Sequence, residues 1–123
     1  MNHPESDLQK ACVKWFDYRW PKYSNLLICV PNGGKRNARE AARFKAEGVR
    51  PGVADLILLV PYNFGLPKCQ VLDYYLCLEL KSDKGRQTEH QKAFQHDVEV
   101  AGGRYVVIRS LDEFIEIIND YLL

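Results

Sequence analysis

The stretch Asp73–Ser82, DYYLCLELKS, has the pattern of a buried strand with a polar end. Its apolar run is followed by Glu79 and Lys81, which are separated by a single leucine. Side chains alternate between the two faces of a strand, so Glu79 and Lys81 lie next to each other on one face. An ordinary ion pair at a strand end would also produce E-x-K, and the motif alone is weak evidence for a site.

A second strand with a polar end lies upstream, where Asp55 opens the segment Asp55–Val60, DLILLV. If the two strands are antiparallel neighbours, Asp55 meets Glu79 and Lys81 at one edge of the sheet. Two carboxylates at that distance repel each other unless a cation lies between them, and such oxygen ligands suit Mg²⁺ or Mn²⁺. A neighbouring lysine stabilises negative charge or orients water, so this group predicts metal-assisted phosphodiester hydrolysis.

The remaining segments alternate between helical and strand patterns. Three helices begin with capping boxes, at Ser6/Gln9, Thr88/Gln91 and Ser110/Glu113. The predicted helices are 6–20, ended by Pro21, then 37–47, 88–102 and 110–123, and the predicted strands are 26–30, 55–60, 73–81 and 105–108. The order α-β-α-β-β-α-β-α predicts one α/β domain over residues 1–123, with a central mixed sheet of about four strands flanked by helices.

Composition excludes several classes of protein. The 123 residues are 46% apolar and 27% charged, as in globular domains and unlike disordered chains. The longest apolar runs have five residues, whereas a membrane span needs roughly 20. No leader pattern begins at Met1, and the four cysteines form no C-x-x-C pair, so we expect reduced thiols in the cytoplasm and no structural zinc.

Charge is segregated along the chain. Residues 35–50 hold six basic and two acidic residues, a net charge of +4, whereas residues 110–123 hold four acidic residues and no Lys or Arg. Two solvated helix faces would explain this as well as a basic surface for a polyanion would. Charge alone leaves both interpretations open.

Two further polar residues join the predicted site by their spacing. Glu5 shares the apolar face of the first helix if that helix extends back by one turn, although an acidic residue that favours a helix N-terminus is the commoner explanation. Gln91 lies in the first turn of the helix after Lys81, where it is also a capping-box residue. The two roles of Gln91 are compatible.

Several motifs in this order resemble the VRR-NUC family, small nuclease domains of the PD-(D/E)XK superfamily that occur in phages, bacteria and a eukaryotic repair nuclease. The resemblance covers the whole chain. The motifs are 31–37 (PNGGKRN), 48–56 (GVRPGVADL), 78–82 (LELKS), 85–91 (GRQTEHQ) and 109–111 (RSL). One departure is Ala54, where the superfamily pattern has proline before the aspartate; proline there is not a ligand, so no chemical group is lost.

The resemblance implies a restriction-endonuclease-like fold and a Mg²⁺- or Mn²⁺-dependent DNA endonuclease. Asp55 and Glu79 would bind the metal, with the Leu80 carbonyl as an extra ligand and Glu5 completing its shell. Lys81 would position water, and Gln91 would orient Lys81 or the scissile phosphate. Backbone contacts to DNA would come from basic residues, as in sequence-independent binding. These are Lys35, Arg36, Arg39, Arg43, Arg50, Lys84 and Arg86.

Small phage-type members of the family resemble dimeric junction resolvases, and the two-fold symmetry of a four-way DNA junction suits a C2 dimer. The resemblance therefore implies a homodimer that acts on branched DNA in replication, recombination or repair, in the host cytoplasm if phage-encoded, with no organic cofactor or membrane partner. Aromatic and apolar side chains could supply its interface, or could simply fill the core. They are Trp15, Phe16, Trp20, Tyr23, Tyr62, Phe64 and Leu66.

Two rivals from other classes remain. One is a non-catalytic DNA-binding module, which would bind DNA without metal-dependent cleavage. The other is a structural or adaptor domain, in which the charged residues form only ion pairs. His3, His90 and His96 have no metal-ligand spacing and are expected at the surface, where His90 could touch substrate.

Overall fold

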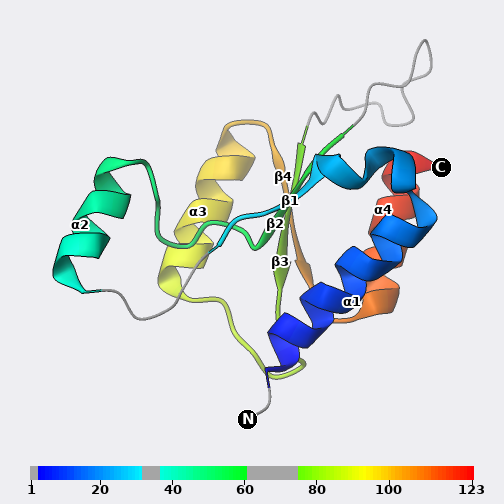
Figure 1. Cartoon of the computed structure of the whole chain (residues 1–123), viewed down its shortest axis with the longest axis horizontal. Coiled ribbons are helices and arrows are strands. Elements are labelled where there is room, and N and C mark those ends of the chain that lie inside the picture. Colours follow the sequence, from blue (N-terminus) through cyan, green and yellow to red (C-terminus); the bar gives the residue numbers. More distant parts are fainter. Residues whose placement is uncertain (1–2, 32–36, 61–74) are drawn as a thin grey trace.

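The computed structural model describes residues 3–31, 37–60 and 75–123. The predicted element order is confirmed, with one added 3-10 helix, η1 (Pro21–Leu26), which takes up Leu26 from the predicted first strand. Asp73 and Tyr74, at the predicted start of the third strand, lie outside the described residues. The elements are α1 (Pro4–Arg19), η1, β1 (Leu27–Cys29), α2 (Ala38–Ala46), β2 (Leu56–Leu59), β3 (Tyr75–Leu80), α3 (Glu89–Val100), β4 (Arg104–Ile108) and α4 (Leu111–Leu122) (Figure 1).

The four strands form one mixed sheet in the order β1-β2-β3-β4, which confirms the predicted fold class. β1 and β3 both run antiparallel to β2, whereas β4 runs parallel to β3. The parallel pair is joined through α3, as a crossover between parallel strands requires. The predicted antiparallel pairing of the strands that carry Asp55 and Glu79 is therefore correct.

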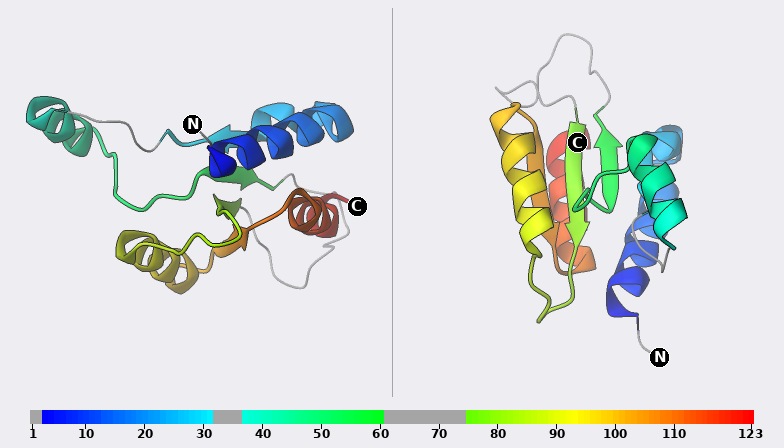
Figure 2. Two further views of the ribbon diagram at one scale, coloured as in Figure 1. Left: turned by 90° about the horizontal axis from the view of Figure 1, so that it is seen from below. Right: turned by 90° about the vertical axis from the view of Figure 1, so that its left-hand side faces the viewer.

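Alternate side chains of each strand pack into two cores. One core includes Leu56, Leu78 and Ile108, which pack with residues of α1 and α4. The other contains Cys77 and Tyr105, which pack with Val98 of α3. Figure 2 shows α3 on one side of β3 and β4 and α4 on the other. Glu79 and Lys81 have the strand parity of Cys77, so they belong to the α3 face.

Helix starts follow the capping predictions in two of three cases. Thr88 and Gln91 form both bonds of a capping box, and Ser110 accepts from the Glu113 N–H. The Ser6 box is wrong: α1 begins two residues earlier, with Pro4 in its first turn. Proline has no N–H to lose at this position and its φ suits a helix, so Ser6 falls inside the helix.

α2 differs from the other helices because none of its residues is buried. Asn37 caps its start through the Glu40 N–H at 2.8 Å, and Gly48, at φ +102°, follows its end as predicted. The helix stands at one end of the layered body (Figure 2). Within the described ranges, no helix has the length and apolar character to cross a membrane.

Four of the residues considered for a dimer interface pack at the core in or just after α1, whereas Tyr18 of α1 is 86% exposed. Phe16 is fully buried, and Trp15, Trp20 and Tyr23 pack partly buried against the same core. The three other members of the set, Tyr62, Phe64 and Leu66, lie outside the described residues. Cys12 and Cys77 are buried free thiols, while Cys29 is exposed although its segment is apolar, because β1 is an edge strand.

Candidate active site

Asp55 joins the strands at the polar end of the sheet. β2 pairs with β3 so that Leu56 faces Leu78, and continuing this register brings Asp55 opposite Glu79. The Asp55 backbone carbonyl accepts from the Val30 N–H at 3.0 Å, and its carboxylate oxygen Oδ2 accepts from the Leu80 N–H at 2.8 Å. Asp55 is thus bonded on both sides, through its backbone to Val30 and through its carboxylate to Leu80, and is held beside Glu79.

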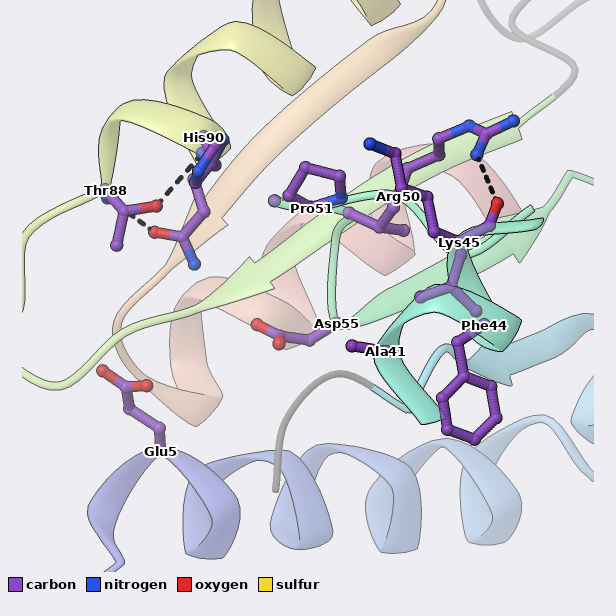
Figure 3. A pocket seen from close by; sticks show the side chains of 13 residues that line it. Glu5, Ala41, Phe44, Lys45, Arg50, Pro51, Asp55, Thr88 and His90 are labelled. Atoms are coloured by element: carbon purple, nitrogen blue, oxygen red, sulfur yellow. Dashed lines mark hydrogen bonds between the residues drawn. The ribbon is translucent and has the colours of Figure 1, made fainter. Parts of the chain in front are cut away.

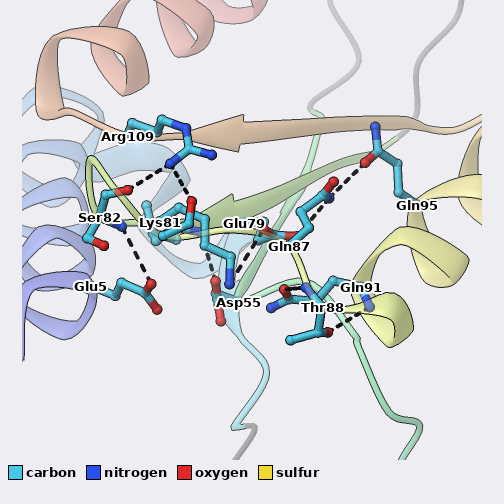
Figure 4. Close-up of polar contacts among 12 residues, drawn as sticks. Glu5, Asp55, Glu79, Lys81, Ser82, Gln87, Thr88, Gln91, Gln95 and Arg109 are labelled. Carbon is cyan, nitrogen blue, oxygen red and sulfur yellow. Dashed lines mark hydrogen bonds and ion pairs between the residues drawn. The ribbon is translucent and has the colours of Figure 1, made fainter.

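Glu79 and Lys81 are buried although they are charged, with 1% and 6% of their surface exposed. Their side chains lie on the same face, with Lys81 Nζ 3.9 Å from Glu79 Oε2. The other oxygen, Oε1, accepts from the Tyr105 hydroxyl. It also accepts from Gln87 Nε2 (Figure 4). Oε2 is buried and accepts no hydrogen bond from any residue that the structure describes.

Glu5 reaches the same end of the sheet from the first turn of α1, so the helix does extend back as the site hypothesis required. Its Oε1 is 3.5 Å from the Ser82 N–H, a long hydrogen bond. Gly85 fits between Glu5 and Lys81, because a Cβ there would meet Glu5 Oε1 at 3.1 Å and Lys81 Cδ at 3.4 Å. The turn after β3 therefore sets the separation of these two side chains.

Gln91 is positioned by its cap. Its amide oxygen accepts from the Thr88 N–H at 2.8 Å, and its own N–H donates to the Thr88 hydroxyl at 3.1 Å. The side chain lines the same cleft as Asp55. The capping role expected from the sequence is confirmed.

Burial raises the pKa of Asp55 above its ordinary value of 3.8. The Leu80 N–H opposes this rise, and the charges of Glu79 and Glu5 add to it. A group of carboxylates whose charge is unfavourable in this way is stabilised by a cation. Glu79 Oε2, which accepts no hydrogen bond from the described residues, and the Asp55 carboxylate are suitable oxygen donors for Mg²⁺ or Mn²⁺.

The donor set is small, however. Among the described residues, no three His, Cys, Asp or Glu side chains converge to form a ready cation site. Glu5 is turned toward the Ser82 N–H, its partner in a long hydrogen bond of 3.5 Å. Asp55 and Glu79 are therefore the protein groups that fit the cation, and waters and a phosphate oxygen are the ordinary remaining ligands of Mg²⁺.

A cleft of about 630 Å³ opens beside Asp55. Figure 3 shows its walls: α2 and the segment 49–53 on one side, the start of α3 on another, and Glu5 at the far edge. Gly52, at φ +77°, lets this segment approach α3, because a Cβ there would be 2.2 Å from the His90 carbonyl oxygen. His90 is exposed and lines the cleft; His3 and His96 are exposed as expected.

The predicted DNA-binding residues occupy two places. Arg39, Arg43 and Arg50 are exposed on or just after α2, and Arg50 also lines the cleft, with its guanidinium 3.1 Å from the Lys45 carbonyl oxygen. Lys84 and Arg86 are exposed in the turn after β3. Lys35 and Arg36 lie outside the described residues. The cleft also has Lys45 on its wall, which the sequence-based set omitted.

Three residues around the site were missed by the sequence analysis: Tyr105, Gln87 and Arg109. Arg109 donates to the carbonyl oxygens of Ser82 at 2.7 Å and Gly85 at 2.8 Å, and so holds the turn that follows Lys81. The alternation of side chains along β4 predicts which residues share a face with Tyr105. Only the parallel pairing of β4 with β3 shows that this face also carries Glu79. Gln87 and Arg109 carried no signal beyond their places in the family-like motifs.

Comparisons with known proteins bear on the fold. The sequence matches no protein-family model and no curated protein. The structure is similar to a solved structure described as "VRR_NUC domain protein", with a TM-score of 0.76 and 23% sequence identity, over 99% of this chain and 90% of the other. Ala54, the departure from the superfamily pattern, is fully buried in the α3-side core. The chain therefore has the VRR-NUC fold, and Asp55, Glu79 and Lys81 lie at one end of its sheet.

Proposed function

We propose that this protein is a divalent-metal-dependent DNA endonuclease. The observation that carries the proposal is the pairing of Asp55 with a buried Glu79 whose Oε2 accepts no hydrogen bond from the described residues, 3.9 Å from Lys81. A buried carboxylate oxygen that accepts no hydrogen bond is costly, and a divalent cation would offset that cost in addition to the Lys81 ammonium 3.9 Å away. The VRR-NUC fold supports the same reading.

Each residue has a distinct role in this proposal. Asp55 and Glu79 hold Mg²⁺ or Mn²⁺, which would supply Lewis acidity toward the phosphodiester. The Lys81 ammonium, buried beside Glu79, offsets negative charge that develops on the phosphate and orients the attacking water. Glu5 and the Leu80 carbonyl would be further ligands, for which Glu5 would exchange its long hydrogen bond to the Ser82 N–H for the cation. Gln91 presents its amide nitrogen toward the phosphate.

DNA would cross the cleft between α2 and the start of α3, with its backbone against basic side chains. Arg39, Arg43, Lys45 and Arg50 supply positive charge on the α2 side, and Lys84 and Arg86 supply it beyond Lys81. Lys35 and Arg36, which precede α2 in the sequence, are proposed DNA contacts as well. Such contacts position a duplex without reading its sequence. We further propose a homodimer that prefers four-way junctions, with a role in replication, recombination or repair in the cytoplasm.

One observation favours a different function. The absence of three converging ligands among the described residues is what a non-catalytic DNA-binding or structural module with this fold would have. Such a module would bind DNA or a protein partner through the same basic surface, without metal-dependent cleavage.

Cleavage assays separate these functions. Single-stranded, duplex, flap and four-way-junction DNAs are incubated with the protein and Mg²⁺, Mn²⁺ or EDTA. We expect metal-dependent cleavage that Glu79→Gln abolishes. Lys81→Ala should reduce cleavage by at least about 100-fold while leaving Mn²⁺ binding in place, because a lysine ammonium is not a metal ligand. Lys92→Ala, on an exposed lysine of α3 that pairs with Glu89, is the control.

Binding of DNA with no cleavage of any substrate in either metal would support the non-catalytic alternative. The dimer and the junction preference have their own test. Sedimentation of a monomer at micromolar concentration, together with equal cleavage of duplex and junction, would contradict both and leave the nuclease proposal standing.

A further inference from the structure

The two oxygens of the Glu79 carboxylate have different surroundings. Oε1 accepts from two donors, the Tyr105 hydroxyl and Gln87 Nε2, the latter at 3.2 Å. Oε2 accepts none from the described residues and faces the Lys81 ammonium at 3.9 Å. The residue as a whole is 1% exposed, so bulk water does not explain the difference.

The donors to Oε1 are themselves held in place by three elements. Tyr105 lies on β4 and is paired with Cys77 of β3. Its hydroxyl reaches Glu79, the next residue of β3 on the same face. The ring of Phe94, from α3, packs edge-on against the Tyr105 ring at 6.1 Å between centroids. The Gln87 amide also donates to Gln95 Oε1 of α3 at 2.8 Å, so both of its N–H groups are used.

We propose that Tyr105 and Gln87 are positioning residues that fix the Glu79 carboxylate through Oε1 and so reserve Oε2 for the divalent cation. This inference rests on the proposed function. The last side-chain torsion of a glutamate normally has a broad, roughly two-fold distribution of angles. Two donors on one oxygen restrict that rotation and fix which oxygen is Oε1. Outer partners that orient a metal ligand typically change metal affinity by 10- to 100-fold.

A purely structural explanation makes a different prediction. A buried tyrosine hydroxyl needs a hydrogen-bond partner, and Glu79 could serve only that need. In that case removal of the hydroxyl would change folding stability and leave the affinity of the site for a cation unchanged. Cation affinity, measured without DNA and without turnover, therefore distinguishes the two explanations.

The experiment measures Mn²⁺ binding to the full chain by electron paramagnetic resonance and calorimetry. Tyr105→Phe removes the hydroxyl and keeps the ring against Phe94. We expect its Kd for Mn²⁺ to rise by roughly tenfold or more, with cleavage substantially restored when Mn²⁺ is raised to saturation. Gln87→Leu should raise the Kd in the same direction, and it provides the test if Tyr105→Phe does not fold.

Tyr121→Phe is the matched control. Tyr121 is 7% exposed against 6% for Tyr105, and its hydroxyl also has a polar partner, Arg104, but it lies on α4. We expect parental Mn²⁺ affinity in this variant. Equal Mn²⁺ affinity in the parent, Tyr105→Phe and Gln87→Leu would overturn this inference alone. A parent protein that binds no Mn²⁺ would overturn the proposed function, and this inference with it.

Discussion

α2 and α4 are both amphipathic in sequence, yet the fold uses them differently. α4 buries four residues, Phe114, Ile117, Ile118 and Tyr121, whereas α2 buries none. The acidic residues of α4 are thus the solvated side of a packed helix, one of the two explanations for charge segregation. The basic residues of α2 are on a helix that packing does not require, beside the cleft that contains Asp55. The contrast shows that α4 contributes buried residues to the core and α2 does not, and it agrees with our proposal that α2 binds DNA.

The largest difference should appear when an aromatic residue is removed from each helix. Phe114 is fully buried and packs edge-on against Trp15 at 6.0 Å between centroids. Phe114→Ala should lower the free energy of unfolding by about 3–5 kcal/mol. Phe44→Ala, in α2, should cost less than about 1 kcal/mol because no α2 residue is buried. Urea denaturation measures both, and equal losses would contradict the contrast.

Removal of charged side chains should have the opposite pattern, with a large effect on DNA affinity in α2 and none in α4. Replacing Arg39 and Arg43 together by Ala should weaken binding of duplex DNA by about tenfold and reduce the slope of log affinity against log salt by about two, since two phosphate contacts are lost. Stability should be unchanged, because both side chains are exposed. The control is Asp112→Asn with Glu116→Gln in α4, for which fluorescence anisotropy should show parental DNA affinity.

The Asp55 carboxylate, beside the cleft, is partly buried, and burial of its charge has a free-energy cost. The raised pKa of Asp55 means that the folded protein binds a proton there more tightly than the unfolded chain does. The stability linked to this group is therefore full below pH 3.8 and is lost as pH rises through the raised pKa. Asp55→Asn keeps an acceptor for the Leu80 N–H and removes the charge, so we expect the Tm of the metal-free protein to rise by a few degrees at pH 7 and to equal the parent's near pH 3.

Calorimetric scans of the metal-free protein at both pH values make this measurement. The exposed Asp97→Asn variant is the control and should show a smaller change. A lower Tm for Asp55→Asn at pH 7 would mean that the Asp55 charge stabilises the fold, contrary to the expected cost of its burial.

The smallest effects concern the helix caps, where the two helices offer a matched pair. Asn37 accepts from the Glu40 N–H at 2.8 Å and Ser110 accepts from the Glu113 N–H at 3.1 Å. Loss of either cap should cost its own helix about 1 kcal/mol. Ser110→Ala should lower global stability by that amount because α4 is packed. Asn37→Ala should instead speed hydrogen exchange within α2 and leave global unfolding nearly unchanged.

Much of the candidate site was predictable because its residues follow strand periodicity. The apolar bodies of β2 and β3 place Asp55 at a strand start and Glu79 at a strand end, and antiparallel pairing joins them. The Thr88 capping box was predictable for a different reason, because both of its hydrogen bonds join residues three apart in the sequence. The start of α1 was not, because Pro4 competed with Ser6 and the sequence does not weigh one local signal against the other.

The sequence by itself determined the order of elements, the polar ends of two strands and the amphipathic character of the helices, because these depend on residues close together in the chain. Tertiary structure decided which amphipathic helix packs its apolar face against the core: α4 buries four residues there, and α2 buries none. It also decided the partners of Glu79, because Tyr105 is 26 residues away and reaches it only through the parallel register of β4. Local patterns specify which side chains share a face; only packing specifies what that face meets.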